Sequence, residues 1–253
     1  MRLVLLPPLG HDHKFYDPLR EVLSSVETHA LDYPYFDESF PWESEDLIEE
    51  LAQYFASQIK AYGKVSLLGV SLGATLSLRV KEILGEKVDH LFLVSSGGHK
   101  VASFRKEMIL THLKEQGPET FLLHALEVGS SKAFEESDFR EHFHVSETAA
   151  KNYWAHYREN LWNTDHRKIG QRALVNLVKA SVEVNYEHLL SRFQKEISII
   201  WGEKDKVFSM RFYEKFKKLC PQSQFYLYKV GHFSPLETPE VFKDILLRHE
   251  KNS

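Results

Sequence analysis

The stretch from residue 65 to residue 76 constrains the fold of this chain more than any other. An apolar run at Val65–Leu68 leads into the pattern Gly-x-Ser-x-Gly at residues 69–73, and a helical pattern follows. Small residues before and after Ser71 let a strand and a helix approach closely, and the sharp turn makes the serine stand clear of the sheet. We therefore predict a strand, a tight turn and a helix, with Ser71 as a candidate nucleophile.

Further short apolar runs alternate with helical patterns along the chain. The expected strands are bounded by Gly, Pro, Ser or Asp and lie at Leu3–Leu6, Val65–Leu68, Leu91–Val94 and Ile197–Trp201, with weaker candidates at Thr28–Leu31 and Phe225–Val230. Apolar residues recur at helical spacing in residues 45–61 and 239–249. This alternation predicts an α/β fold with a mostly parallel sheet of about six strands flanked by helices.

The interval 104–193 interrupts this alternation. It contains almost no strand-like run, and its helical segments are rich in aromatic and charged residues. We predict that it forms a helical lid inserted into an α/β core made of residues 1–103 and 194–253. For any single aromatic residue in the lid, packing onto the core is the simpler explanation.

The charge, the cysteine content and the lengths of the apolar runs indicate which binding partners and which cellular compartment to expect. The formal charge of −4 does not indicate a surface that binds polyanions, so we expect no nucleic-acid partner. The single cysteine, Cys220, excludes an intrachain disulfide and is predicted to be structural. No apolar stretch reaches the roughly 18 residues that a membrane span requires, and the N-terminal run is too short for a signal peptide. These features predict a cytoplasmic protein without membrane contact.

A serine hydroxyl is a weak nucleophile unless a general base, oriented by an acid, removes its proton. Asp205 and His232 each follow a predicted strand, so both should lie at the carboxyl edge of the sheet, where Ser71 also lies. The chain order Ser, Asp, His suits a nucleophile on a strand-to-helix turn. We predict a catalytic triad of Ser71, His232 and Asp205, and Glu203 remains the alternative acid.

Acyl transfer also needs two N–H donors for the oxyanion. One is expected from Leu72, directly after the nucleophile. The other is expected from the loop after the first strand, where Pro7 and Pro8 have no N–H, so Leu9 is the first available donor.

Histidines occur in pairs two residues apart, at His11 and His13 and again at His142 and His144. No third ligand follows with metal-site spacing. We therefore predict no metal ion, and a mechanism through Ser71, His232 and Asp205 needs no organic cofactor.

Residues 3–10, 69–73, 202–205 and 231–233 together resemble the α/β-hydrolase superfamily. The resemblance covers about residues 1–100 and 195–250, and it implies the α/β-hydrolase fold and the same three catalytic roles. The chain departs from the family at Pro7-Pro8, where these proteins usually read His-Gly, and at residues 35–40, which replace a Gly-rich loop.

Within the superfamily, the chain resembles small carboxylesterases such as the pimeloyl-carrier-protein methyl ester esterase. That resemblance implies substrate contacts from Phe121 and Leu122 in the lid, and Trp154 and Phe233 are further candidates. It also implies an acyl carrier protein as a partner, for which a set of arginines is available, although a solvated helix face explains them more simply: Arg140, Arg158, Arg167 and Arg172.

These patterns predict a serine hydrolase that cleaves a carboxylic ester through an acyl-enzyme on Ser71. A lyase, a thioesterase or a C–C bond hydrolase with the same triad remains an alternative, and a non-catalytic binding module is a remote one. Haloalkane dehalogenases and epoxide hydrolases are disfavoured because they carry Asp where this chain has Ser71.

Overall fold

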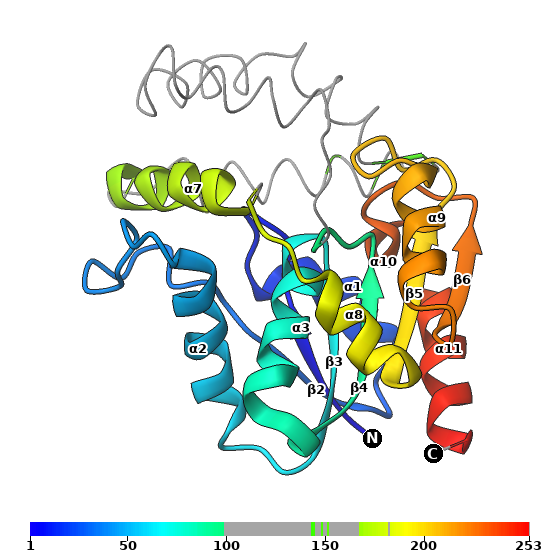
Figure 1. The fold of residues 1–253 in the computed structure, drawn as a ribbon. Helices are drawn as coiled ribbons and strands as arrows, with labels where there is room; N and C mark the ends of the chain where they lie inside the picture. Colours follow the sequence, from blue (N-terminus) through cyan, green and yellow to red (C-terminus); the bar gives the residue numbers. More distant parts are fainter. Residues whose placement is uncertain (99–142, 145–147, 149–150, 152–166, 182, 253) are drawn as a thin grey trace.

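A parallel sheet forms the centre of the computed structural model, which describes residues 1–98, 143–144, 148, 151, 167–181 and 183–252. The strands are β1 (Arg2–Leu6), β2 (Glu27–Ala30), β3 (Val65–Val70), β4 (Val88–Val94), β5 (Ile197–Gly202) and β6 (Gln224–Tyr228). They are arranged in the order β2-β1-β3-β4-β5-β6, and every neighbouring pair is parallel. Figure 1 shows the labelled strands β3, β4, β5 and β6 in this order. The predicted α/β fold with a parallel sheet is confirmed, and both weaker strand candidates are strands.

Burial differs between the central and the edge strands. Every residue of β3 and β5 is buried, because helices cover both faces of the sheet. The edge strands β2 and β6 are only partly buried and carry more polar side chains. The strength of the apolar signal in the sequence therefore follows the position of each strand in the sheet.

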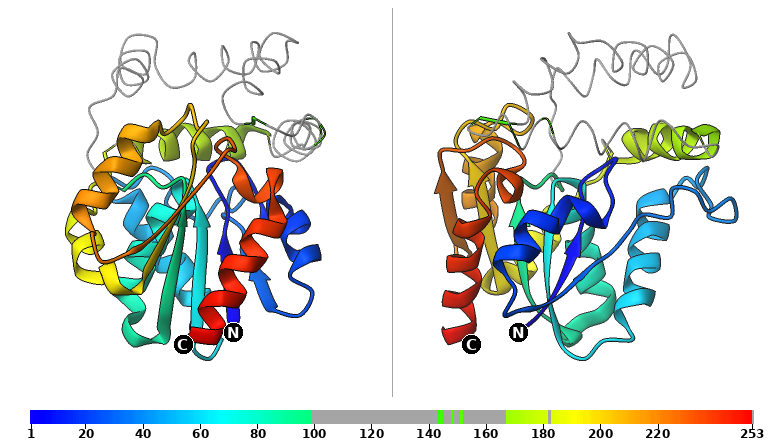
Figure 2. Two further views of the ribbon diagram at one scale, coloured as in Figure 1. Left: turned by 90° about the vertical axis from the view of Figure 1, so that its right-hand side faces the viewer. Right: turned by 180° about the vertical axis from the view of Figure 1, so that it is seen from behind.

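Helices form a layer on each face (Figure 2). One layer contains α2 (Leu47–Ile59), α3 (Leu72–Leu84), α8 (Glu187–Phe193) and α9 (Met210–Leu219), with α7 (Arg167–Ser181) beside α2. The other contains α1 (Asp17–Val22), α10 (Ser234–Glu237) and α11 (Pro239–Asn252). Short 3-10 helices lie at His13–Tyr16, Gly85–Lys87 and Gln194–Glu196. Within these described ranges, no helix has the length and apolar character needed to cross a membrane.

Helix α8 lies at the end of the predicted lid interval. Its residues Leu189, Leu190 and Phe193 are buried in the same core cluster as residues of α3 and α9. Most of residues 104–193 lies outside the described residues, so the division into core and lid stays a prediction.

Cys220 ends helix α9 and is buried. Its Sγ lies 3.1 Å from the carbonyl oxygen of Phe216. Burial raises the pKa of the thiol, which keeps it protonated and weakly reactive. This environment agrees with the predicted structural role.

We expect a low pH to destabilise the folded protein because it favours protonation of His90, a buried residue of β4. Its Nε2 lies 2.9 Å from Ser198 Oγ and its ring 4.0 Å from that of His249. Burial lowers the pKa of His90 to about 3 and also lowers that of His249, so folding favours the neutral imidazoles. The contribution of His90 to the free energy of unfolding is complete above the unfolded pKa of about 6.5. It is lost as the pH falls towards the pKa of about 3 in the folded protein.

We expect the stability difference between pH 7 and pH 5 to be up to about 2 kcal/mol smaller in His90→Gln than in the wild type. Urea unfolding at the two pH values measures it, with the exposed His188→Gln as the control. An unchanged pH response in His90→Gln would show that His90 is not the sensitive group.

Candidate active site

The predicted site residues follow four strands that end at one edge of the sheet. Leu9 follows β1, Ser71 follows β3, Asp205 follows β5 and His232 follows β6. Since β2 lies on the far side of β1, the winding of the sheet reverses between β1 and β3. Ligands of open α/β sheets bind at the carboxyl edge beside such a reversal, and Ser71 lies there.

Ser71 has a strained backbone between β3 and α3. Its φ is 54° and its ψ is −113°, a conformation that a residue with a side chain rarely adopts. Its N–H donates to the carbonyl of Val94 at 2.9 Å, and its carbonyl accepts from the N–H of Thr75 at 3.2 Å. Strain of this kind persists where the surroundings impose it and is concentrated at functional sites.

Both glycines of the motif stand where no side chain fits. A Cβ on Gly69 would lie 2.4 Å from the Gly73 carbonyl, and a Cβ on Gly73 would lie 2.1 Å from the Leu6 carbonyl oxygen. The first contact lets α3 begin directly against β3. The second brings the end of β1, and with it the loop that carries Leu9, against the first turn of the helix behind Ser71.

Asp205 and His232 form a buried pair. Asp205 Oδ2 lies 2.9 Å from His232 Nδ1. The other carboxylate oxygen accepts from the N–H groups of Val207 and Phe208 at 2.9 and 2.8 Å. One carboxylate oxygen is thus held by the backbone, while the other is positioned to orient the imidazole through Nδ1.

Glu203, the alternative acid, is in a different position. Its side chain is partly exposed and makes no hydrogen bond with His232 in the described structure, while its N–H donates to the carbonyl of Tyr228 at 2.7 Å. The structure therefore brings Asp205, and not Glu203, to the histidine.

Gly202 allows the segment before His232 to cross the end of β5. A Cβ at Gly202 would lie 2.3 Å from the carbonyl oxygens of both Val230 and Gly231. The adjoining loop is held by the Lys204 N–H, which donates to the Val230 carbonyl at 3.0 Å. The Asp205 loop and the His232 loop are thus joined through their backbones.

We expect Gly202→Ala to lower the free energy of unfolding by about 1–3 kcal/mol, because the new methyl group meets backbone atoms that cannot move independently. Urea unfolding measures this. Gly63→Ala is the matched control, since a Cβ there meets only the end of the Arg2 side chain, at 3.1 Å. Equal stabilities of the two variants would contradict the proposed crossing.

The His232 segment extends across the sheet edge towards β1. The ring of Phe233 lies 5.3 Å from that of His11 and 5.3 Å from that of Phe15, both in the region that follows β1. Because β3 and β4 lie between β1 and β5, the segment passes over the edge where Ser71 lies. Ser71 and His232 make no hydrogen bond with each other in the described structure, and such bonds often form only when substrate is bound.

Leu9 lies in a tight turn after β1. The His11 N–H donates to the Pro8 carbonyl at 3.2 Å, and Gly10 adopts a φ of 79° that favours glycine. The Gly10 N–H donates to the Tyr35 hydroxyl at 2.7 Å. The N–H of Leu9 makes no hydrogen bond with another described residue, which suits the predicted oxyanion donor.

Leu72 is the first residue of α3. The first N–H groups of a helix have no acceptor within the helix, so its N–H is also available. Gly73 brings the first turn of α3 against the end of β1. One predicted donor, Leu9, lies in the loop after β1, and the other, Leu72, lies in that first turn of α3.

Glu237 of α10 is a site residue that the sequence did not reveal. Its Oε1 accepts from the Gly231 N–H at 2.7 Å, and its Oε2 accepts from the His144 N–H at 2.8 Å. It therefore links the loop before His232 to residues of the predicted lid. The only sequence signal is an acidic residue shortly after the histidine, and no known spacing assigns it this role.

Only some of the residues predicted to contact the substrate or a carrier protein belong to the described part of the structure. Phe233 is buried, and its ring lies 5.7 Å from that of Phe143. Several candidates lie outside the described residues: Phe121, Leu122, Arg140, His142, Trp154 and Arg158. Arg167 and Arg172 belong to α7. Substrate contacts and carrier binding stay predictions, and the described residues contain no group of three or more possible metal ligands.

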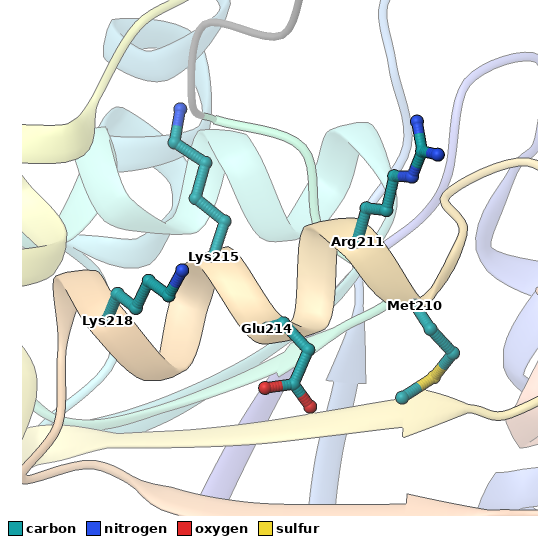
Figure 3. Close-up of a pocket in the computed structure, with 5 residues that line it drawn as sticks. All are labelled: Met210, Arg211, Glu214, Lys215 and Lys218. Atoms are coloured by element: carbon teal, nitrogen blue, oxygen red, sulfur yellow. The ribbon is translucent and has the colours of Figure 1, made fainter.

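A surface pocket of about 410 Å³ lies along α9. Figure 3 shows Arg211 and Lys215 pointing to one side of the helix and Glu214 to the other. Lys215 also pairs with Glu187 at 2.5 Å, which offsets part of the basic charge. None of the three predicted triad residues lines this pocket, so it is separate from the candidate site.

A family model described as the alpha/beta hydrolase fold matches residues 2–239. Among solved structures, a thermophilic esterase from Thermogutta terrifontis is 17% identical over 100% of this chain and 90% of its own, with a TM-score of 0.68. A hydrolase from Oleispira antarctica is 15% identical over 100% and 91%, with a TM-score of 0.75. The 2-hydroxy-6-oxo-6-phenylhexa-2,4-dienoate hydrolase from Rhodococcus sp. strain RHA1 is 16% identical over 99% and 90%, with a TM-score of 0.69. These likenesses show a shared fold, and a search of curated proteins by sequence finds no match.

Proposed function

Because the chain belongs to the alpha/beta hydrolase fold family, we propose that it hydrolyses carboxylic esters through an acyl-enzyme on Ser71. The observation that carries this proposal is the buried Asp205–His232 pair, with 2.9 Å between Oδ2 and Nδ1, at the same sheet edge as the strained Ser71. A buried carboxylate that orients an imidazole is the arrangement that activates a serine hydroxyl.

In the proposed acylation step, Ser71 Oγ attacks the acyl carbon while His232 Nε2 takes the hydroxyl proton. The tetrahedral intermediate collapses, the bond to the leaving oxygen breaks, and the imidazolium returns the proton to the departing alcohol. Asp205 keeps its contact with Nδ1 and stabilises the imidazolium. Water then attacks the acyl-enzyme with His232 again as the base, which releases the carboxylic acid and restores Ser71.

The N–H groups of Leu9 and Leu72 would hold the oxyanion in both steps. The N-terminus of α3 adds a partial positive charge on the same side. Hydrogen bonds of this kind act mainly on the transition state, because the negative charge on the oxygen develops only there.

The proposed substrate is an acyl ester, either small or carried by an acidic acyl carrier protein. Predicted lid residues Phe121, Leu122 and Trp154, together with Phe233, would contact the acyl group. The arginines at 140, 158, 167 and 172 would face the carrier protein. The roles of Phe121, Leu122 and the arginines rest on the sequence resemblance to small carboxylesterases.

A panel of p-nitrophenyl esters and matched thioesters of graded acyl length tests the proposed reaction. We expect the esters to be hydrolysed with a clear optimum of chain length, and we expect thioesters of the same acyl groups to be poorer substrates. No turnover of any ester would contradict an esterase and favour a lyase or a C–C bond hydrolase. Preferred turnover of thioesters would instead identify a thioesterase.

A further inference from the structure

We propose that Tyr33 and Tyr35 are positioning residues of the oxyanion hole, whose hydroxyl groups fix the loop at Pro7–Gly10 so that the Leu9 N–H is presented towards Ser71. The inference rests on the proposed function and extends it. It assigns a role to two buried tyrosines that take no part in the chemistry itself.

Both hydroxyls bind the backbone of the loop. The Tyr35 hydroxyl accepts from the Gly10 N–H at 2.7 Å, and the Tyr33 hydroxyl donates to the Pro7 carbonyl at 3.0 Å. The two residues come from the segment after β2, about 25 residues further along the chain. Both side chains are buried, at 4% exposure for Tyr33 and 3% for Tyr35.

The two hydrogen bonds lie on either side of the Pro8–Leu9 peptide, which carries the N–H of Leu9. The Leu9 N–H shares a peptide plane with the Pro8 carbonyl, which accepts from the His11 N–H at 3.2 Å. Tyr33 holds the preceding plane through the Pro7 carbonyl, and Tyr35 holds the following plane through the Gly10 N–H. A peptide plane whose two neighbours are fixed has little freedom to rotate, so the direction of its N–H is fixed as well.

The double proline explains why the loop needs this support. Because Pro7 and Pro8 have no N–H, this stretch of backbone can form fewer hydrogen bonds with the rest of the structure. Tyr16 reinforces the start of the loop, where its hydroxyl donates to the Leu6 carbonyl at 2.6 Å. Tyrosine hydroxyls thus satisfy buried polar groups that would otherwise be costly to leave without partners.

The rings are themselves held in place. The Tyr33 ring lies 5.1 Å from that of Tyr35 and 5.2 Å from that of Phe55 on α2. The Tyr35 ring is stacked with Trp42 at 6.0 Å. Burial raises the pKa of Tyr33 well above its usual value, so its hydroxyl stays protonated and able to donate. The hydroxyls are therefore rigid supports for the loop.

Tyr33→Phe and Tyr35→Phe test the proposal, because each keeps the ring and removes only the hydroxyl. Direct loss of an oxyanion donor costs about 100- to 1000-fold in kcat, so loss of a support should cost less. We expect each variant to lower kcat about tenfold while KM changes less than twofold. Tyr54→Phe is the matched control, since Tyr54 is a half-buried residue of α2 whose ring contacts Phe40 and Phe55.

A trifluoromethyl ketone provides a readout that a merely structural role would not change. Its adduct with Ser71 places an oxyanion in the hole, so its inhibition constant should weaken by the same factor as kcat/KM. The inhibition constant of a carboxylate product, which carries no tetrahedral oxyanion, should stay within twofold. The two single variants test the two supports separately, and thermal unfolding of each reports whether the fold is retained.

Values of kcat and ketone inhibition equal to those of Tyr54→Phe would overturn the inference while leaving the esterase proposal intact. Equal losses in kcat and in binding of the product would also overturn it, because they indicate general damage to the site. A wild-type protein that neither hydrolyses esters nor binds the ketone would overturn both proposals.

Discussion

Replacing Ser71 with alanine is expected to lower kcat for ester hydrolysis by about 10⁴- to 10⁶-fold and to leave the fold intact. The variant lacks the oxygen that forms the acyl-enzyme, so only direct attack by water remains. The residual rate comes from substrate binding and from the oxyanion donors, which the change does not remove. Initial rates with the best p-nitrophenyl ester of the panel measure the effect.

Ser57→Ala is the control for this experiment. Ser57 is exposed on α2, and its hydroxyl donates to the Tyr54 carbonyl at 2.7 Å. Its loss should leave kcat within twofold of the wild type. If Ser71→Ala kept a tenth or more of the wild-type rate, the nucleophile would have to be another residue.

Asp205→Asn is expected to lower kcat by about 10⁴-fold. The amide is almost isosteric with the carboxylate but carries no charge to stabilise the imidazolium. Its NH₂ group can also donate to His232 Nδ1, which selects the tautomer that carries its proton on Nε2 and cannot act as the base. Rates should be compared with circular dichroism spectra, which report whether the fold is retained.

Glu203→Gln is a particularly sharp control for this variant. Glu203 is also an acidic residue of the loop after β5, and the sequence alone allows it as the alternative acid. Because it makes no hydrogen bond with His232 in the described structure, its loss should change kcat less than threefold. A larger effect at Glu203 than at Asp205 would overturn the assignment of the acid.

The central sheet could be predicted from the sequence because its strands are buried on both faces. Residues 65–68 and 197–201 form apolar runs of the expected length, and they belong to β3 and β5. The strands β2 and β6 gave weaker signals because they form the two edges, where polar side chains reach solvent. The predictability of each strand thus follows the number of faces that it buries.

The order of the strands also explains why Asp205 and His232 could be predicted as a pair. Each residue follows a predicted strand, and parallel strands bring their carboxyl ends to the same edge of the sheet. The roles of the two residues as acid and base follow from chemistry and still require the experiments above. Their contact through Nδ1 is what the structure adds.

The supports of the site could not be predicted in the same way. Tyr35 is 25 residues from Gly10, and Glu237 is 93 residues from His144. Such contacts depend on how loops from different strands pack together at the edge of the sheet. No local pattern in a single sequence predicts which residues of these loops come into contact. The double proline did indicate Leu9 as the first N–H donor, but it gave no sign that tyrosine hydroxyls hold the loop.

Labelling with a fluorophosphonate probe identifies the nucleophilic serine of the protein. The probe reacts with an activated serine and leaves a stable phosphonyl group on the nucleophile, which mass spectrometry can locate in a proteolytic digest. We expect a single adduct on Ser71, absent from Ser71→Ala and formed much more slowly in Asp205→Asn. An unmodified wild-type protein, or an adduct on a different residue, would contradict the assignment of Ser71 as the nucleophile.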